Sequence, residues 1–328
     1  MTRIFFSTDV HGSEICFRKF LNALKIYKAD VGILLGDLTG KMITPIIKQE
    51  DGSYLCEYVG HKKIVRTEEE LRELEKNISL IGNYYFYTTP KEFEELKSEG
   101  KTIDGRIDER SRKIHLGKGK IEGLFKRLSA ERLANWIALA EEKLKGSHIK
   151  MFMAPGNDDD MEISRILDSS TFVVNADGRK VEFDGYEMIT LSWSNPTPWD
   201  TPRECSEEEL CKKIENLVSK IENMEKAIFN FHAPPYGTVL DLAPKLSENL
   251  VPSASELVNV GSTAVLDAIK AHQPLLSLHG HIHESKGAQK IGRTICINPG
   301  SEYTEGILCG VIINLDKGKV KNYLFTAG

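Results

Sequence analysis

Short apolar runs alternate with longer stretches of helical period along most of the chain. Several of the runs are almost continuously apolar, which is typical of strands that are covered on both faces. The strands we expect are RIFFST, VGILLG, IKMFMA, YEMITLSW, AIFNF, PLLSL, RTICIN, ILCGVIINL and VKNYLF. The helices we expect cover residues 14–26, 129–145, 207–225 and 262–272. This alternation predicts an α/β fold with mixed layers.

Residues 41–128 have a different pattern and are more highly charged. TEEELRELEKN has a capping box at Thr67 and Glu70, and TPKEFEELKSEG begins with Thr89 and Pro90, so each predicts an exposed helix. The basic segment GRIDERSRKIHLGKGK follows them. We therefore expect a single domain over the whole chain, with residues 41–128 inserted into it as a helical and basic cap.

The composition of the chain limits the classes of partner that we expect. Of the 328 residues, 41% are hydrophobic, which is enough for a full core, and the net charge is −5. A sequence-independent grip on nucleic acid needs a basic surface, so nucleic acid is possible as a partner but is not favoured. No apolar run reaches the roughly 18 residues of a membrane-spanning helix, so we expect no membrane partner.

The N-terminal sequence MTRIFFSTDVHG leads directly into a predicted strand, without the apolar region of a signal peptide. The six cysteines include no C-x-x-C pair, and four of them lie in apolar surroundings. Without a secretion signal, we expect reduced cysteines that pack as small hydrophobic residues, and a cytoplasmic protein.

Polar side chains follow five of the predicted strands at the point where each strand ends. In chain order they are Asp9 and His11, Asp37, Asn157 and Asp158, His232, and His281 and His283. Open α/β sheets bind ligands at the carboxyl ends of their strands, so we expect these groups to lie together. A two-residue period would place Asp9 and His11 on one side of an extended chain. The same holds for His281 and His283.

Each motif has an ordinary explanation when it stands alone. A single D-x-H is common, a Gly-Asp pair after a strand is usually a turn, and His232 before APPY could be a loop histidine. GHIH, residues 280–283, is more specific, because two imidazoles at strand spacing suggest a metal site. All five motifs in order, each at a strand end, favour a functional site over five unrelated turns.

The series resembles the motifs of the calcineurin-like metallophosphoesterase superfamily, which run D-x-H, G-D, G-N-H-[D/E], H and G-H-x-H. In this chain they stand as DVH at 9–11, GD at 36–37, GNDD at 156–159, His232, and GHIH at 280–283. NPGS at 298–301 also resembles a turn that is common in the family after the last motif. The resemblance covers nearly the whole chain outside the insertion. It implies a four-layer α/β/β/α sandwich of two mixed sheets.

The resemblance also implies two divalent metal ions that share one carboxylate. Asp9, His11, Asp37 and His283 would hold the first ion, and Asp37, Asn157, His232 and His281 would hold the second. The chemistry agrees, because a carboxylate can bridge two cations about 3.5–4 Å apart. Nitrogen and oxygen ligands without thiolate suit Mn, Fe, Zn, Co or Ni better than Ca or Mg.

A metal-dependent phosphoric ester hydrolase follows from the resemblance. A water between the two ions would be acidified toward hydroxide near neutral pH and would attack phosphorus directly, in line with the leaving group. The same cations would neutralise the phosphoryl oxygens as charge develops on them. No covalent intermediate is then needed.

The third motif departs from the family pattern at one position. Where the family has a histidine that contacts the phosphoryl group or protonates the leaving oxygen, this chain has Asp158. Asp159 stands where the family has an acid that orients this histidine. Neighbouring cations lower the pKa of an aspartate, so Asp158 should be ionised and unable to donate a proton. The site should therefore bind metal yet lack the usual general acid.

Three interpretations of Asp158 stay open. The substrate could be an ester with a good leaving group, for which acid catalysis contributes little. Another group could supply the proton, either a metal-bound water or one of His61 and His115 in the insertion. Finally, Asp158 could cap the helix expected to begin near Met161, because aspartate is a favoured N-cap.

The substrate that we expect is a small phosphoester. The absent acid favours phosphodiesters, including nucleotide-like ones, over monoesters with poor leaving groups. One alternative is a nuclease or nucleotide-processing phosphohydrolase with the same metal site. A second alternative is a non-catalytic metal-binding scaffold or interaction module, although all seven proposed ligands are present. The basic residues 106–113 could hold extra phosphates and Trp199 could stack on a ring, or they could be a solvated face and a loop anchor.

Overall fold

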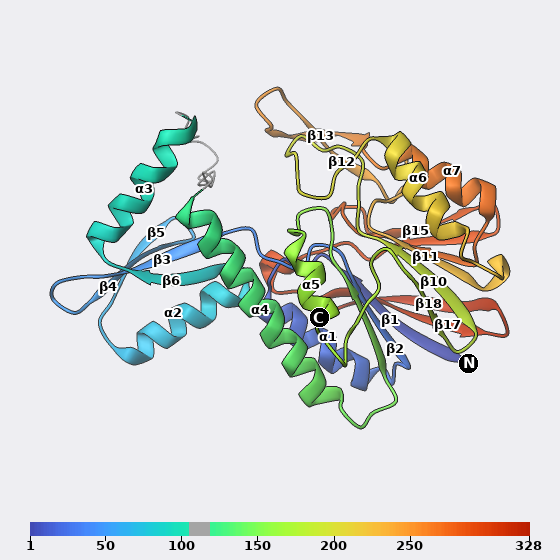
Figure 1. The fold of residues 1–328 in the computed structure, drawn as a ribbon, viewed down its shortest axis with the longest axis horizontal. Coiled ribbons are helices and arrows are strands. Elements are labelled where there is room, and N and C mark those ends of the chain that lie inside the picture. The colour runs from blue at the N-terminus through green and yellow to red at the C-terminus, as the bar shows by residue number, and fades with distance from the viewer. Residues whose placement is uncertain (105–118) are drawn as a thin grey trace.

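The computed structural model describes residues 1–104 and 119–328, and its centre is a pair of six-stranded sheets (Figure 1). The first sheet has the order β18-β17-β1-β2-β7-β8 and the second has the order β15-β16-β14-β11-β10-β9. The first sheet consists of β1 (Thr2–Thr8), β2 (Val31–Leu35), β7 (Lys150–Ala154), β8 (Val174–Asn175), β17 (Cys309–Asp316) and β18 (Lys319–Ala327). The second sheet consists of β9 (Lys180–Phe183), β10 (Tyr186–Leu191), β11 (Ala227–Phe231), β14 (Leu276–Leu278), β15 (Gly287–Ile291) and β16 (Thr294–Asn298).

The two sheets pack face to face, with helices on their outer faces. Along β1 the side chains alternate: Ile4 and Phe6 lie in the core between the sheets, whereas Phe5 lies in the core under the helices. The first sheet is covered by α1 (Glu14–Ile26), α4 (Lys120–Leu144) and α5 (Glu162–Asp168), and the second by α6 (Glu207–Val218) and α7 (Thr263–His272). The predicted four-layer α/β/β/α sandwich is confirmed.

The central strands of each sheet run parallel, and their carboxyl ends meet at one edge. In the first sheet Thr8, Leu35 and Ala154 are the last residues of three neighbouring parallel strands and lie in register. In the second sheet β10, β11, β14 and β16 are likewise parallel. Antiparallel strands flank both parallel sets. The loops that leave five parallel strands therefore begin close together.

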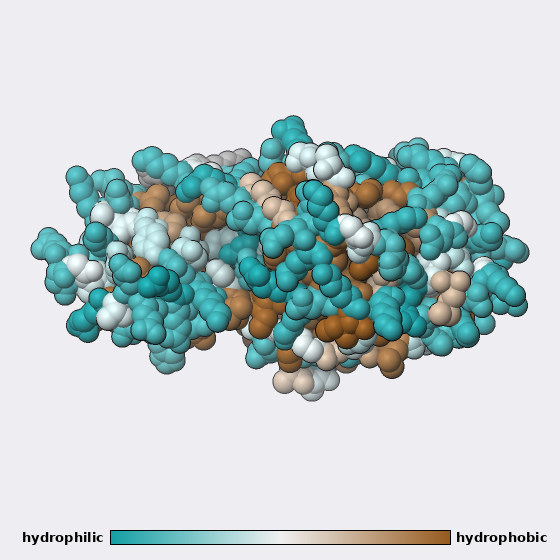
Figure 2. Space-filling view, turned by 90° about the horizontal axis from the view of Figure 1, so that it is seen from below, coloured by the Kyte–Doolittle hydropathy of each residue, from teal (hydrophilic) through white to brown (hydrophobic). Residues whose placement is uncertain are grey.

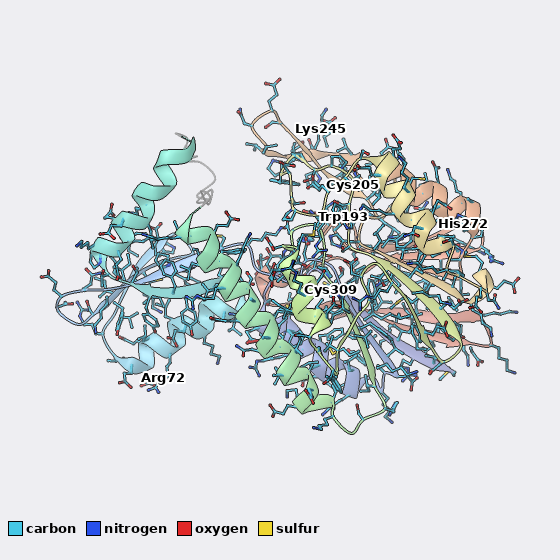
Figure 3. All side chains as sticks on the ribbon, viewed as in Figure 1. Arg72, Trp193, Cys205, Lys245, His272 and Cys309 are labelled. Atoms are coloured by element: carbon cyan, nitrogen blue, oxygen red, sulfur yellow. The ribbon has the colours of Figure 1, made fainter. Side chains whose placement is uncertain are left out.

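Between β2 and β7 the chain forms a separate lobe beside the sandwich, which we call the inserted lobe (Figure 1). It holds a four-stranded sheet of order β5-β4-β3-β6: β3 (Ile43–Lys48), β4 (Tyr54–Tyr58), β5 (His61–Val65) and β6 (Tyr84–Thr88). The helices α2 (Glu68–Leu80) and α3 (Pro90–Asp104) match the two that the sequence predicts, and the capping box at Thr67 is present. Arg72 on α2 and His272 on α7 lie toward opposite ends of the molecule (Figure 3).

The sheet of the inserted lobe was not expected, because its strands are only partly buried. On β5 the residues before Val65 are exposed, and they include two lysines. Such a strand has neither a continuous apolar run nor a clear alternation. The core of the lobe is small and consists of Ile46, Cys56, Val65, Leu74 and Ile78.

The helix α4 begins at Lys120, nine residues before the start predicted from its pattern, and so joins the inserted lobe to the sandwich. Near its start the ring of Phe125 lies 5.6 Å from that of Tyr84 in the lobe. Farther along, Trp136 stacks on Phe17 of α1 at 4.3 Å. The predicted helix over 207–225 is also shorter than expected and is followed by a 3-10 turn, η1 (Met224–Lys226).

The hairpin of β12 (Leu242–Leu246) and β13 (Pro252–Asn259), which the pattern did not predict, lies on the side of the second sheet. The 3-10 turn η2 (Tyr303–Glu305) lies on the side of the first sheet, next to α1. All six cysteines are free. Hydrophilic residues cover most of the face in Figure 2, with apolar residues visible between them. In the described ranges 1–104 and 119–328, no helix is long and apolar enough to cross a membrane.

Candidate metal centre

The loops after β1, β2, β7, β11 and β14 bring the predicted acid, amide and imidazole groups together. Ligand atoms within 4.8 Å of one another form three overlapping groups: Asp9, His11 and His283; Asp9, Asp37 and His232; and His11, Asp37 and Asp158. Asn157 and His281 join them through hydrogen bonds. Every residue that the sequence predicts as a metal ligand therefore lies in one cluster.

The backbone reaches this arrangement through left-handed residues. Asp9, His11 and His281 have φ angles of 52°, 41° and 68°. The expectation that the D-x-H and H-x-H pairs share one side of an extended chain is therefore wrong, because β1 ends at Thr8 and β14 ends at Leu278. Non-glycine residues in this region each cost of order 1–3 kcal/mol, and such strain is concentrated at functional sites.

Glycines let the loops approach each other closely. A Cβ atom on Gly36 would lie 2.2 Å from Nδ1 of His232, and one on Gly156 would lie 2.2 Å from Oδ1 of Asp37. A Cβ on Gly280 would lie 2.3 Å from Oδ2 of Asp9. The motif glycines are thus required by contact with the cluster itself, in addition to the turn that Gly36 makes at a φ of 72°.

The amide oxygen of Asn157 faces two imidazoles. Its Oδ1 is 2.8 Å from Nε2 of His232 and 2.8 Å from Nδ1 of His281. The Nδ2 group donates to the hydroxyl of Thr201 at 2.8 Å, which directs the oxygen toward the cluster. Asn157 therefore presents a neutral oxygen ligand between two nitrogen ligands.

The two oxygens of Asp37 face different parts of the cluster. Oδ2 lies 3.6 Å from Nε2 of His11, and Oδ1 lies 3.7 Å from Nε2 of His232. On the first side, Nε2 of His11 and Nε2 of His283 are 3.1 Å apart. A carboxylate with one oxygen toward each of two imidazole sets has the arrangement that a bridging ligand needs.

Asp9 fits a cation as well. Its Oδ2 accepts hydrogen bonds from the Thr8 hydroxyl at 2.6 Å and from the backbone N–H of His281 at 3.0 Å. Its Oδ1 is buried and has no hydrogen-bond donor among the residues that the structure describes. A buried charged oxygen without a partner is costly, and a metal ion would satisfy it.

Burial favours the neutral, metal-binding form of three of the imidazoles. Burial is the largest influence on each: it lowers the pKa of His281 to about 3 and lowers the pKa values of His11 and His232 below the ordinary value. A histidine must be neutral to act as a ligand, so these rings are ready to bind cations at neutral pH.

The pKa values of the two central carboxylates are shifted in opposite directions. Burial alone would raise the pKa of Asp9, but the imidazoles of His232, His283 and His11 lower it below its ordinary value. Burial raises the pKa of Asp37 well above its ordinary value, and the neighbouring carboxylates of Asp158 and Asp9 add to the increase. A cation between the two acids would favour the ionised form of both. The cluster could therefore bind metal ions.

Asp158 lies at the edge of the cluster and pairs with Lys41. Its Oδ2 is 2.7 Å from Nζ of Lys41, and its backbone N–H donates to Oδ1 of Asp37 at 3.0 Å. The interpretation of Asp158 as a helix cap is wrong: the N-cap of α5 is Met161, without a side-chain cap, and Asp160 accepts from the N–H of Glu162. Asp158 is directed toward the cluster.

Asp159 joins two of the loops. Its buried carboxylate accepts hydrogen bonds from the backbone N–H groups of Leu38, Thr39 and Gly156 at 2.8–2.9 Å, and from the Thr39 hydroxyl. These bonds hold the loop after β2 against the loop after β7, so Asp159 has a structural role at the position where the family has an orienting acid. Burial raises the pKa of Asp159, and the donors oppose that shift.

Of the two histidines considered as proton donors, the described residues include His61. His61 is exposed on β5 of the inserted lobe. His115 and the basic residues 106–113 lie outside the described residues. Trp199 is exposed in its loop.

Three residues near the cluster were missed by the sequence analysis. Lys41 pairs with Asp158, Thr201 orients Asn157, and the ring of Tyr303 lies 4.5 Å from that of His11. Lys41 follows the G-D motif and Tyr303 follows NPGS. No spacing rule marks either one, because their roles come from contacts across the fold.

The sequence of the chain matches part of another protein. No protein-family model matches the chain. A protein of Methanocaldococcus jannaschii named "Uncharacterized protein MJ1162" is 31% identical over 154 residues, which are 46% of this chain and 64% of that protein. The match thus spans less than two thirds of this relative.

Two solved structures have a similar fold over nearly the full length. TT1561 of Thermus thermophilus has a TM-score of 0.52 and 15% identity, with 100% of this chain and 98% of that chain covered. A second crystal structure has a TM-score of 0.55 and 15% identity, with 99% and 98% covered. At this identity the likeness shows the fold alone. The chain is thus a mixed α/β sandwich with an Asp/His cluster that could bind metal ions.

Proposed function

We propose that this protein is a dinuclear metal-dependent phosphoesterase that hydrolyses small phosphodiesters. The observation that carries the proposal is the cluster itself: groups from five strand ends, far apart in sequence, lie within ligand distance of one another. The motif order that resembles the calcineurin-like metallophosphoesterases supports the same conclusion.

We assign the ligands as two sets that share Asp37. Asp9, His11, Asp37 and His283 form one set, and Asp37, Asn157, His232 and His281 form the other. The separate directions of the two Asp37 oxygens support its role as the bridge. The proximity of Asp9 to His232, at 3.9 Å, shows how close the two sets are.

The chain's own residues prepare the site for an anionic substrate. Bound divalent cations, from among Mn, Fe, Zn, Co and Ni, would supply Lewis acidity toward a phosphoester and toward water. The buried imidazoles stay neutral, and Asn157 contributes an oxygen without charge, so the ligand set does not cancel the charge of the cations. A phosphodiester suits the site better than a monoester with a poor leaving group, because Asp158 replaces the usual acid.

Two other functions remain as alternatives. A nuclease would use the same ligands, but the net charge of −5 does not favour a long polyanion. An interaction module that binds no metal would not need strained residues at Asp9, His11 and His281, whose φ angles are positive. A metal-binding scaffold would need them, and the assay below distinguishes it from an enzyme. We therefore favour the small-substrate enzyme.

The test is metal analysis of the purified full chain together with an assay on an activated aryl phosphodiester, across several divalent ions. We expect about two ions per chain and turnover that a chelator abolishes and added metal restores. Two bound ions with no turnover on diesters, monoesters or nucleotides would favour the scaffold, and no bound metal would refute the proposed site.

A further inference from the structure

Lys41 lies beside the cluster, a few residues after Asp37 on the same loop. Its Nζ is 2.7 Å from Asp158, whose carboxylate is itself within 4.8 Å of ligand atoms of His11 and Asp37. Across residues 1–104 and 119–328, Lys41 is the one lysine or arginine that forms an ion pair with an acid of the cluster. Its ammonium group therefore contacts a carboxylate that itself lies beside the expected metal ligands.

The backbone that carries Lys41 is firmly held. The two amides of residues 38 and 39 donate to Asp159, and the N–H of Gly40 donates to the phenol oxygen of Tyr84 at 2.7 Å. The side chain beyond this backbone is 41% exposed. A fixed Cα with an accessible ammonium group is suited to meet an incoming anion.

The neighbouring carboxylates also keep Lys41 positively charged. Burial would lower the pKa of Lys41, but the carboxylates of Asp158 and Asp37 more than compensate and raise it above its ordinary value, so the group stays charged. An ionised Asp158 alone would repel a phosphoester. An ammonium group has three N–H donors and can bind Asp158 and a second anion together.

We propose that Lys41 is a substrate-binding residue, which binds a non-bridging phosphoryl oxygen while Asp158 holds its ammonium group toward the site. This inference rests on the proposed function, because it requires a phosphoester at the metal ions. Asp158 stands where the resembling family has a histidine that contacts the phosphoryl group. The inference assigns that contact to the neighbouring Lys41 instead.

Calorimetric binding of inorganic phosphate to the Mn-loaded full chain tests the inference without turnover. We expect Lys41→Met to bind phosphate roughly 10- to 100-fold more weakly, the range for loss of a charge-assisted hydrogen bond. Lys41→Arg should recover part of the affinity. The KM for an aryl phosphodiester should rise in parallel with the phosphate dissociation constant, with metal content unchanged.

Lys126→Met is the matched control. Lys126 is a similarly exposed lysine, 46% at the side chain, and pairs at 3.2 Å with Asp160, two residues after Asp158. None of the ion pairs that it forms with described residues is with an acid of the cluster. We expect wild-type phosphate affinity in this variant.

The double variant Lys41→Met with Asp158→Asn separates direct contact from simple neutralisation. Asp158→Asn removes the repulsion by the carboxylate, so the double variant should bind phosphate more tightly than Lys41→Met. If Lys41 contacts phosphate, however, the double variant should still bind phosphate more weakly than the wild type. Recovery of wild-type affinity would show that Lys41 only cancels the charge of Asp158 and would overturn the inference. Unchanged phosphate affinity in a folded Lys41→Met variant would also overturn the inference. A wild-type protein without bound metal or turnover would instead refute the proposed function, and the inference with it.

Discussion

The sandwich and the inserted lobe differ in the size of the apolar cores around which they fold. The sandwich has three apolar cores, one between the sheets and one under each helical layer. Among the described residues, the lobe has a core of five buried residues, and its strands are partly exposed. The lobe nevertheless contacts the loops that carry the cluster, so a small core does not exclude a role of the lobe in function.

Three glycines form the contact between these regions. A Cβ on Gly40 would lie 1.9 Å from the carbonyl oxygen of Gly82 in the lobe, and one on Gly12 would lie 2.8 Å from the same oxygen. Arg132 of α4 donates to the carbonyl of Gly12 at 2.6 Å, and Ser13 donates to the carbonyl of Leu80. The lobe is thus fastened to the loops of His11 and Asp37.

The largest effect should come from the sandwich side, at Asp37. We expect Asp37→Asn to weaken both metal ions and to abolish turnover in a chain that stays folded, because the amide cannot bridge two cations as a carboxylate does. Elemental analysis and circular dichroism measure this. The exposed Asp267→Asn on α7 is the control. Full metal content in Asp37→Asn would show that the ligand assignment is wrong.

The second-largest effect on metal binding should come from Gly82, where the lobe contacts the His11 loop. Its φ is 91°, and a Cβ there would lie 2.0 Å from the carbonyl oxygen of His11. We expect Gly82→Ala to displace the His11 loop and to lower metal affinity at least about tenfold, as a positioning effect. Isothermal titration with Mn measures it.

Gly52→Ala is the control for backbone strain within the same lobe. Gly52 has a φ of 84° and nothing within 4 Å of its Cβ position. Both alanines carry the roughly 1–2 kcal/mol cost of the left-handed conformation, so a difference in metal affinity reports the contact alone. Equal affinities would show that the lobe does not position the metal loops.

A smaller effect should follow from Asp158→Ala. Because Asp158 is not a proton donor in our proposal, the variant should lose less than the 10²–10⁴-fold typical of a general acid on an activated aryl phosphodiester. Steady-state kinetics measures it. A thousandfold loss of kcat would show that Asp158 takes part in the chemical step.

The smallest effect on the metal centre should come from the core of the lobe. Leu74 on α2 is fully buried there, and Leu74→Ala should cost about 2–5 kcal/mol of lobe stability. Hydrogen exchange should show faster opening of β3–β6, while the metal content stays as in the wild type. Loss of metal would mean that the lobe must be intact throughout for the loops to hold their ions.

The predictions from sequence succeeded where a local period carried the signal. The helix over 14–26 was located to the residue, and β1, β2, β7 and β11 lie where their apolar runs predicted them. The sheet of the lobe was missed because partly exposed strands have no such signal, and the start of α4 was placed late because its first turns bury little.

The sequence alone determined which side chains are available at the strand ends and that five strands deliver them, because strand period and side-chain chemistry are local properties. The tertiary structure decided how they meet: the left-handed turns at Asp9 and His281, and the bond from Asp158 to Asp37 across 121 positions of sequence. It also decided that Asp158 pairs with Lys41 instead of capping a helix. Such contacts depend on packing between distant segments, and no local pattern encodes them.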